Sequence, residues 1–243
     1  SIRPFNEVDM LVCADLSYVD WDGIVEKEEV SLEEACRKYL SLYSEKELKS
    51  KYTFSINLPH LIDALQDTIR YGNIKLKNYK KVYSDEDVIQ FSVVTLVLPD
   101  GSLVLSFSGT DGSITGWKEN LMMTYSKDLP CQILAKDYVK ETIADIPETS
   151  YLFGLKKKKV YPKMYLTGHS KGGNLAMYAY LKNPKLQGYI EGVKSFDGPG
   201  FADGFWQGDE DVSKITNYIP KDSIVGRVLD HREQTKVLDA QGS

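Results

Sequence analysis

The sequence predicts an α/β fold with a mostly parallel central sheet and a helical N-terminal segment. Three observations lead to this prediction. A strand, a glycine-rich turn and a helix follow one another between residues 161 and 181. After residue 90, apolar β-branched runs alternate with stretches of helical spacing, the pattern of parallel strands joined by helices. Before residue 85, most apolar residues recur three and four positions apart, which is typical of helices with one buried face.

Length and composition indicate one domain. The chain has 243 residues, 42% of them hydrophobic, enough for one sizeable core. We therefore expect a single domain over 1–243, with a helical N-terminal segment over 1–85 and an α/β core over 86–243. A net charge of −5 argues against nucleic-acid binding, because phosphate contacts need a basic surface.

Cysteine usage and hydropathy bear on the cellular compartment. Cys13, Cys36 and Cys131 lie far apart, without the paired spacing of a zinc site or a disulfide framework. No apolar run approaches 18 residues, and no signal-peptide pattern opens the chain. We expect a cytoplasmic protein with reduced thiols and at most a peripheral membrane contact.

Three helices are predicted in the N-terminal segment. Residues Phe5–Tyr18 carry apolar residues at helical spacing. Ser31 followed by Glu34 forms a capping box that opens a second helix, Leu32–Tyr43. Residues Leu58–Tyr71 repeat the helical pattern.

A β-hairpin is predicted next, because the apolar runs Phe91–Leu98 and Leu103–Phe107 flank a Pro-Asp-Gly turn. The stretch Ile114–Met123 is amphipathic, with its charged residues, Lys118 and Glu119, on the side opposite its apolar ones.

A further helix is predicted over Gln132–Ile146, and the lysine run Lys156–Lys159 is interpreted as a solvated loop. Short strands are predicted over Val193–Phe196, Ile215–Ile219 and Thr235–Leu238.

The turn after the strand that ends at Thr167 has the sequence Gly168-His169-Ser170-Lys171-Gly172. This Gly-x-Ser-x-Gly pattern between a strand and a helix predicts a nucleophile elbow, in which glycines allow a strained turn to present the serine. The following helix directs unpaired N–H groups toward the site. The elbow predicts that the core over 86–243 is a hydrolase core with the α/β-hydrolase fold and with Ser170 as the nucleophile.

A serine nucleophile needs a base and a carboxylate that orients the base. Asp222 and Asp197 both follow strand ends downstream of Ser170, and we favour Asp222 because it follows the later strand. After Ser170, the histidine that remains outside the elbow is His231. The base is therefore predicted to be His231 or a histidine on residues that follow 243.

An oxyanion hole needs two backbone N–H groups. One is predicted from Lys171, the residue after the nucleophile. The other is predicted from Thr110, in the Phe107–Thr110 segment that ends an earlier strand, where Gly109 allows close approach of the backbone.

These motifs resemble known proteins. Phe107-Ser108-Gly109-Thr110 followed by Trp117, the Gly168–Gly172 elbow, and Pro220-Lys221-Asp222-Ser223-Ile224-Val225 are similar to motifs of the fungal-type (class three) lipases of the α/β-hydrolase superfamily. The chain is more similar still to an uncharacterised bacterial lipase-like family, which shares the Gly-His-Ser-Lys-Gly-Gly-Asn-Leu-Ala elbow and the segment Asp197–Phe201.

The resemblance implies Ser170 as nucleophile, Thr110 and Lys171 as oxyanion donors, Asp222 as the acid, and a mobile lid over Ile114–Met123. Two features depart from the lipases. Ser108 stands where the lipases usually carry arginine. Their catalytic histidine also lies much further beyond the acid in sequence than His231 lies beyond Asp222. The bacterial family implies a histidine in a segment after residue 243.

The sequence thus predicts a serine hydrolase that cleaves a small-molecule acyl ester or lipid through an acyl-enzyme, without a metal or an organic cofactor. Another serine hydrolase, such as a thioesterase, amidase or peptidase, would use the same residues. A non-catalytic binding or scaffold protein could retain the elbow for packing.

Overall fold

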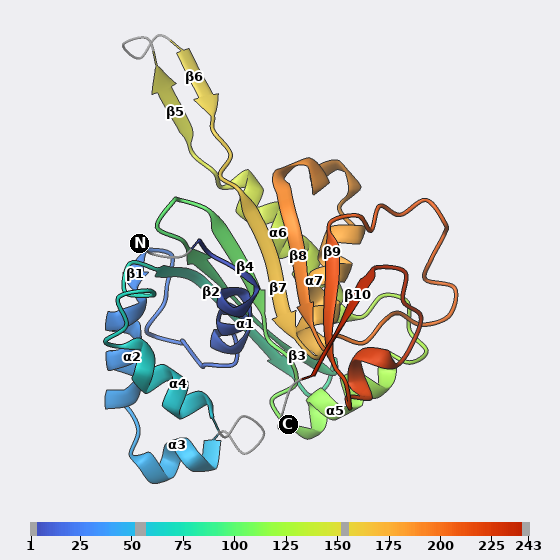
Figure 1. Cartoon of the computed structure of the whole chain (residues 1–243), viewed down its shortest axis with the longest axis horizontal. Coiled ribbons are helices and arrows are strands. Elements are labelled where there is room, and N and C mark those ends of the chain that lie inside the picture. The colour runs from blue at the N-terminus through green and yellow to red at the C-terminus, as the bar shows by residue number, and fades with distance from the viewer. Residues whose placement is uncertain (1–3, 52–56, 152–155, 240–243) are drawn as a thin grey trace.

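A computed structural model describes residues 4–51, 57–151 and 156–239. Its main sheet has eight strands in the order β1-β2-β3-β4-β7-β8-β9-β10 (Figure 1). Their bounds are β1 (Val30–Ser31), β2 (Lys75–Ser84), β3 (Ile89–Val97), β4 (Leu103–Phe107), β7 (Met164–His169), β8 (Ile190–Phe196), β9 (Ile215–Pro220) and β10 (Gln234–Leu238).

The two halves of the sheet differ in strand direction. From β1 to β4 neighbouring strands pair antiparallel, and β3 and β4 form the predicted hairpin. From β4 through β7, β8 and β9 to β10 every pair is parallel. The carboxyl ends of these five strands therefore lie along one edge of the sheet, where α/β proteins place their sites. The predicted α/β-hydrolase arrangement is confirmed.

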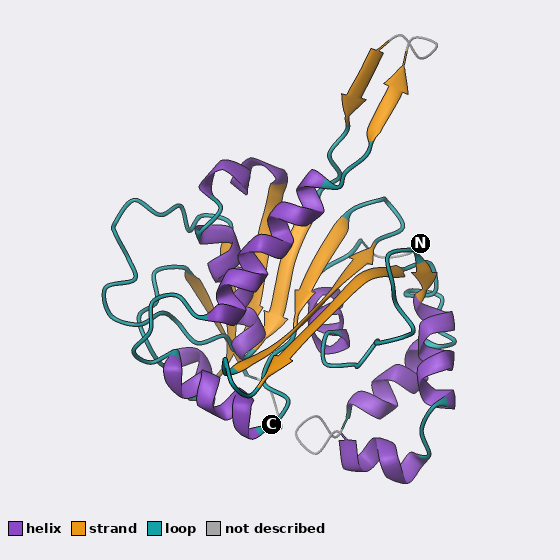
Figure 2. Ribbon diagram, turned by 180° about the vertical axis from the view of Figure 1, so that it is seen from behind, coloured by secondary structure: helices purple, strands orange, loops and turns teal. Residues whose placement is uncertain are grey.

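Helices cover both faces of the sheet (Figures 1 and 2). One hydrophobic cluster joins the sheet to the first group of helices, and a second cluster joins the opposite face to the other group. The first group comprises α1 (Glu7–Leu16), α2 (Leu32–Ser41) and α4 (Leu58–Leu65), near which lies α3 (Glu45–Lys51). The second comprises α5 (Ile114–Met122), α6 (Pro130–Ala144) and α7 (Lys171–Leu181). Short 3₁₀ helices are η1 (Pro184–Tyr189) and η2 (Val225–Arg227).

The N-terminal segment is less helical than predicted. Ser31 caps α2 by accepting a hydrogen bond from the Glu34 amide, as expected. The helix predicted over 58–71 ends at Leu65, and strand β2 occupies residues 75–84. Strand β2 lacks an apolar run, since Leu76 is its one fully buried residue, so periodicity did not reveal it.

The prediction of a loop over Lys156–Lys159 is wrong. These residues form β6, which pairs antiparallel with β5 (Glu148–Tyr151) in a hairpin that projects from the body of the protein (Figure 1). Strand pairing depends on backbone hydrogen bonds, and each lysine supplies the same backbone donor and acceptor as any other residue except proline. Glu148 lies opposite Lys159 in this register.

No helix within the described ranges combines the length and apolar character needed to cross a membrane. Cys13, Cys36 and Cys131 are all buried and unpaired.

Candidate active site

The predicted elbow is present at the junction of β7 and α7. Ser170 has φ +54° and ψ −127°, a backbone conformation that is strained for a residue with a side chain. A Cβ added at Gly172 would lie 2.1 Å from the Phe107 carbonyl oxygen, and one at Gly168 would lie 2.3 Å from Gly172. The strand and the helix therefore approach so closely that only glycine fits on either side of the serine.

A cavity of about 380 Å³ opens at this turn. Ser170 is partly exposed and lines the cavity together with Thr110 and Lys171. The structure thus brings the predicted nucleophile and both predicted oxyanion residues to one site. The rest of the wall is mainly apolar and includes Trp117, Met123, Pro199, Ile224, Val225, Val228 and Leu229.

The backbone amides of Thr110 and Lys171 have no hydrogen-bond acceptor among the described residues. The Ser170 hydroxyl likewise has no hydrogen-bond partner there. Lys171 is the first residue of α7, so its N–H is one of the donors that a helix leaves unpaired at its start. Thr110 and Lys171 line the same cavity as Ser170, and N–H groups that face such a cavity without a protein partner can stabilise negative charge on a bound oxygen.

The Lys171 side chain is buried, with 1% of its surface exposed. Its ammonium group forms an ion pair with the Glu119 carboxylate of α5, which is fully buried, and also donates to Gln90. The sequence pattern placed Glu119 on the charged, outward side of this helix, and this prediction is wrong. The apolar residues Ile114 and Leu121 are instead 76% and 66% exposed.

His169, the residue before the nucleophile, contacts a residue that the sequence did not indicate. Its Nδ1 lies 2.9 Å from the hydroxyl of Tyr18, just beyond the end of α1. Burial lowers the pKa of His169 and outweighs the opposing effect of the Asp197 charge. Tyr18 also lines the Ser170 cavity, so the N-terminal segment contributes to the site.

The two candidate acids lie at strand ends, as predicted, but in different environments. Asp197, after β8, accepts hydrogen bonds from the Ser223 hydroxyl at 2.6 Å and from the Gly226 amide at 2.9 Å. Asp222, after β9, is exposed and has no hydrogen-bond partner among the described residues. Neither carboxylate is bonded to a histidine or to Ser170 in the described structure.

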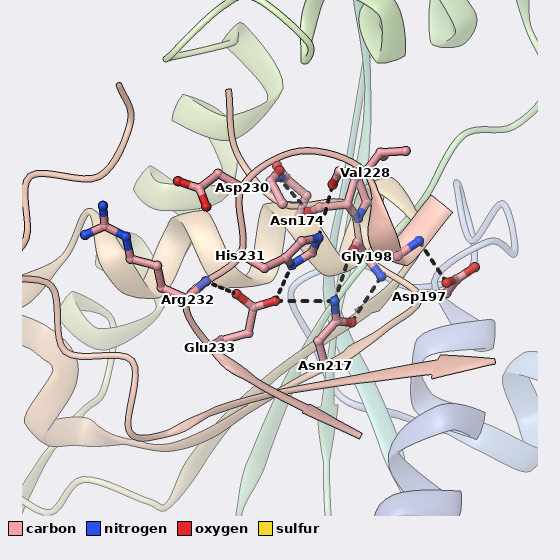
Figure 3. Close-up of polar contacts among 12 residues, drawn as sticks. Asn174, Asp197, Gly198, Asn217, Val228, Asp230, His231, Arg232 and Glu233 are labelled. Atoms are coloured by element: carbon pink, nitrogen blue, oxygen red, sulfur yellow. Dashed lines mark hydrogen bonds and ion pairs between the residues drawn. The ribbon is translucent and has the colours of Figure 1, made fainter. Parts of the chain in front are cut away.

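His231 belongs to a separate polar network (Figure 3). Its Nδ1 lies 2.6 Å from a Glu233 carboxylate oxygen and its Nε2 lies 3.1 Å from the Val228 carbonyl oxygen. Burial alone would lower the pKa of His231, but the hydrogen bond and charge of Glu233 raise it above the usual value. Both partners are acceptors, so both ring nitrogens are satisfied only when the imidazole is protonated. The structure does not bring His231 into contact with Ser170.

The same network reaches the turn after β8. Glu233 also faces the Asn217 amide at 3.4 Å, and Asn217 exchanges two hydrogen bonds with the backbone of Gly198. His231 therefore lies in a group of contacts that holds the Asp197–Gly198 turn against β9 (Figure 3).

Among the described residues no group of His, Cys, Asp and Glu side chains is arranged to hold a metal ion.

A largely parallel sheet with a glycine-flanked, strained serine at a strand end is characteristic of α/β-hydrolase folds. Within that class, the Mbeg1-like family model matches residues 65–243. The chain therefore belongs to the Mbeg1-like family. No curated protein gives a significant match to the sequence.

The chain is also similar to solved structures. The chain is similar to a lipase from Rhizopus microsporus var. chinensis, with a TM-score of 0.52 and 11% identity over 98% of this chain and 76% of that one. M37 lipase matches with a TM-score of 0.43 and 18% identity, over 90% of this chain and 68% of that one. A fungal lipase–inhibitor complex matches with a TM-score of 0.44 and 12% identity, over 93% of this chain and 76% of that one. At such identities, the likeness to the first structure concerns the fold.

Proposed function

We propose that this protein is a serine hydrolase that cleaves carboxylic esters, with Ser170 as its nucleophile. One observation carries the proposal: the strained, partly exposed Ser170 shares a cavity with Thr110 and Lys171, the two residues predicted to supply the oxyanion amides. The mainly apolar wall of that cavity favours an acyl or lipid substrate. The lipase fold of the structural match supports the same class of substrate.

The proposed reaction begins when the Ser170 Oγ attacks the ester carbonyl carbon and a base takes the hydroxyl proton. The carbonyl oxygen becomes an oxyanion, which accepts hydrogen bonds from the Thr110 and Lys171 amides. The carbon–oxygen bond to the alcohol then breaks as the base returns the proton to the leaving oxygen. Water, deprotonated by the same base, hydrolyses the acyl-enzyme and restores Ser170.

Asp222 is our proposed acid, because it follows the later strand and its exposed carboxylate has no other partner among the described residues, whereas each oxygen of Asp197 already accepts one hydrogen bond. The sequence left two candidates for the base, His231 and a histidine on residues after 243. The hydrogen bonds of His231 favour the second candidate. A fully bonded imidazolium has no lone pair with which to accept the serine proton.

A second function, that of a binding or scaffold protein, is favoured by one observation. No imidazole within the described residues is hydrogen-bonded to the Ser170 hydroxyl. An elbow without a base would bind an acyl compound and not turn it over.

Labelling with a fluorophosphonate separates these functions. We expect an adduct on Ser170, located by peptide mass spectrometry, that is absent from Ser170→Ala. Ser213→Ala, at an exposed serine outside the cavity, serves as the matched control and should label like the parent. The labelling is done on a chain that includes the residues after 243, because the proposed base lies there. An unlabelled Ser170 in that folded protein would exclude the nucleophile and leave the binding function.

The class of hydrolase is tested with a substrate panel. We expect p-nitrophenyl esters of varied chain length to be cleaved faster than matched thioesters and anilides, because the proposal assigns carboxylic esters. Faster cleavage of thioesters or anilides would assign the site to a thioesterase or an amidase instead.

A further inference from the structure

A buried ion pair joins helix α5 to the residue that follows the nucleophile. Glu119 and Lys171 are 0% and 1% exposed, and they are 52 positions apart in the chain. The Lys171 ammonium has three N–H donors, and the structure provides three acceptors: a Glu119 carboxylate oxygen, the Gln90 backbone carbonyl and the Gln90 side-chain oxygen. The second Glu119 oxygen accepts the Gln90 amide at 3.4 Å. The buried charges are therefore fully compensated.

Stability alone does not account for this pair. Two charges removed from water lose much of their hydration, and an apolar pair of similar volume is often as stable or more so. A fully bonded ion pair does, however, specify one distance and one orientation between the two elements that carry it. Here those elements are α5 and the first residue of α7, next to Ser170.

Helix α5 also holds the other predicted oxyanion residue. The Thr110 hydroxyl donates to the Asn120 side-chain oxygen at 2.9 Å, and Asn120 directly follows Glu119. At the start of the helix, Thr115 is buried and contacts Asp85 and Tyr83. The buried side of α5 is thus attached to the elbow, to the Thr110 loop and to the turn between β2 and β3.

We propose that Glu119 is a positioning residue, which holds Lys171 so that its amide keeps a fixed spacing from the Thr110 amide. On this view α5 is a fixed bridge across the oxyanion hole and not the mobile lid that the resemblance implied. The inference rests on the proposed ester hydrolysis for its kinetic readout. Its structural readout is independent of that function.

The kinetic test replaces the pair by apolar residues, in the double variant Glu119→Leu with Lys171→Met. We expect the unfolding midpoint to remain within about 4 °C of the parent, because an apolar pair can fill the same space. The kcat for a p-nitrophenyl ester should fall by about 10-fold or more, toward the loss seen when one oxyanion donor is removed, with KM changed less than about twofold. The kcat of Glu119→Gln, which retains an acceptor for Lys171, should lie between those of the parent and the double variant.

The matched control is another buried acid in an ion pair, Asp9, which contacts Arg70; neither residue lines the cavity. Asp9→Asn should lower the unfolding midpoint and leave kcat unchanged. A double variant that folds and keeps kcat within about twofold of the parent would overturn the positioning role, because an oxyanion donor is worth far more than that.

Hydrogen exchange tests the bridge without relying on activity. In the parent, peptides covering 107–123 should exchange as slowly as those of α6, and in the double variant they should exchange about 10-fold faster while α6 is unchanged. Fast exchange of α5 in the parent would overturn the bridge, whatever the enzyme assays show. Absence of hydrolysis and of a Ser170 adduct in a parent chain that includes the residues after 243 would refute the proposed function alone and leave the exchange result to decide the bridge.

Discussion

Two adjacent strands of the sheet end in residues with nearly the same strained backbone. Ser170 follows β7 with φ +54°, and Asp197 follows β8 with φ +55°. Their side chains differ. Both Asp197 oxygens accept hydrogen bonds from the loop that begins after β9, whereas the Ser170 hydroxyl has no partner among the described residues.

The comparison teaches that backbone strain alone does not identify a reactive residue. At Asp197, hydrogen bonds to Ser223 and Gly226 offset the strain locally and hold the loop that carries Ile224 and Val225 to the cavity. At Ser170, the offset comes from the packing of β7 against α7, and the hydroxyl is left without a protein partner among the described residues, in a position that lines the cavity. Strained residues cluster at functional sites, where the surrounding structure holds them in place, and Ser170 fits this pattern because no hydrogen bond of its own side chain offsets the strain.

The largest expected effect comes from removing the side chain at each turn. Ser170→Gly should abolish ester hydrolysis, a loss of roughly 10⁴-fold or more, and raise the free energy of unfolding by about 1 kcal/mol because glycine adopts this backbone without strain. Asp197→Gly relieves the same strain but should lower stability, since it removes two hydrogen bonds. Urea unfolding and ester assays measure both effects, and a Ser170→Gly variant that retains turnover would remove the basis for the comparison.

The next effect separates the two carboxylates. Asp222→Asn should lower kcat by about 10²-fold or more, since the base would lose its orienting charge, with little change in stability because the side chain is exposed. Asp197→Asn should instead lower the free energy of unfolding by about 1–3 kcal/mol, because it weakens charged hydrogen bonds. If Asp197→Asn is the variant with the larger loss of kcat per folded molecule, the assignment of the acid is reversed.

A third prediction concerns the close packing at the serine turn. In Gly172→Ala the new methyl group would meet the Phe107 backbone, which cannot move aside, so we expect a loss of stability of about 3 kcal/mol or more. At Gly198, beside Asp197, the nearest atom is the Ser195 side-chain oxygen, and the loss should be smaller. Gly188→Ala, where nothing lies within 4 Å of the added carbon, is the control for both. Equal losses at Gly172 and Gly198 would contradict this account.

The smallest effect is a pH dependence in the network behind Asp197. The pKa of His231 is raised, so its contribution to stability is complete below its unfolded pKa and is lost as the pH rises through the raised value. Burial alone would raise the pKa of Glu233, but the hydrogen bond and charge of His231 outweigh burial and lower it. The contribution of Glu233 to the free energy of unfolding is therefore lost as the pH falls through the lowered pKa. Glu233→Gln should therefore lower the free energy of unfolding most, by about 1 kcal/mol, between these two pKa values. Unfolding curves measured from about pH 4 to 9 test this.

The same network provides a test of the base. If the base lies after residue 243, His231→Ala in a chain that includes those residues should retain ester hydrolysis per folded molecule while losing this pH dependence. Loss of hydrolysis without loss of folding would restore His231 as the base.

Much of the site could be predicted because its chemistry is local in sequence. Gly168, Ser170 and Gly172 lie within one turn, and their spacing encodes the strand-to-helix geometry directly. Thr110 is distant in sequence, yet its position was predictable, because β4 and β7 are neighbours whose ends meet at one edge of the sheet. The hairpin over residues 89–107 was equally readable from its apolar runs.

The elements that were missed lack such local signals. Strand β2 and the lysine strand β6 have no apolar run, and both form through backbone pairing with a neighbour that composition does not reveal. Their existence depends on partners in the fold rather than on their own side chains.

By itself, the sequence determined that a serine would be presented between glycines at the end of a parallel strand, because the steric limits of that turn act over five residues. Only the tertiary structure decided which charges are buried. Glu119 is placed by pattern on the outer face of its helix, but it turns inward because Lys171 and Gln90 satisfy its charge in the interior. A charge can be buried only where partners compensate it, and those partners meet only in the folded chain. The periodicity of apolar residues along a helix does not predict them.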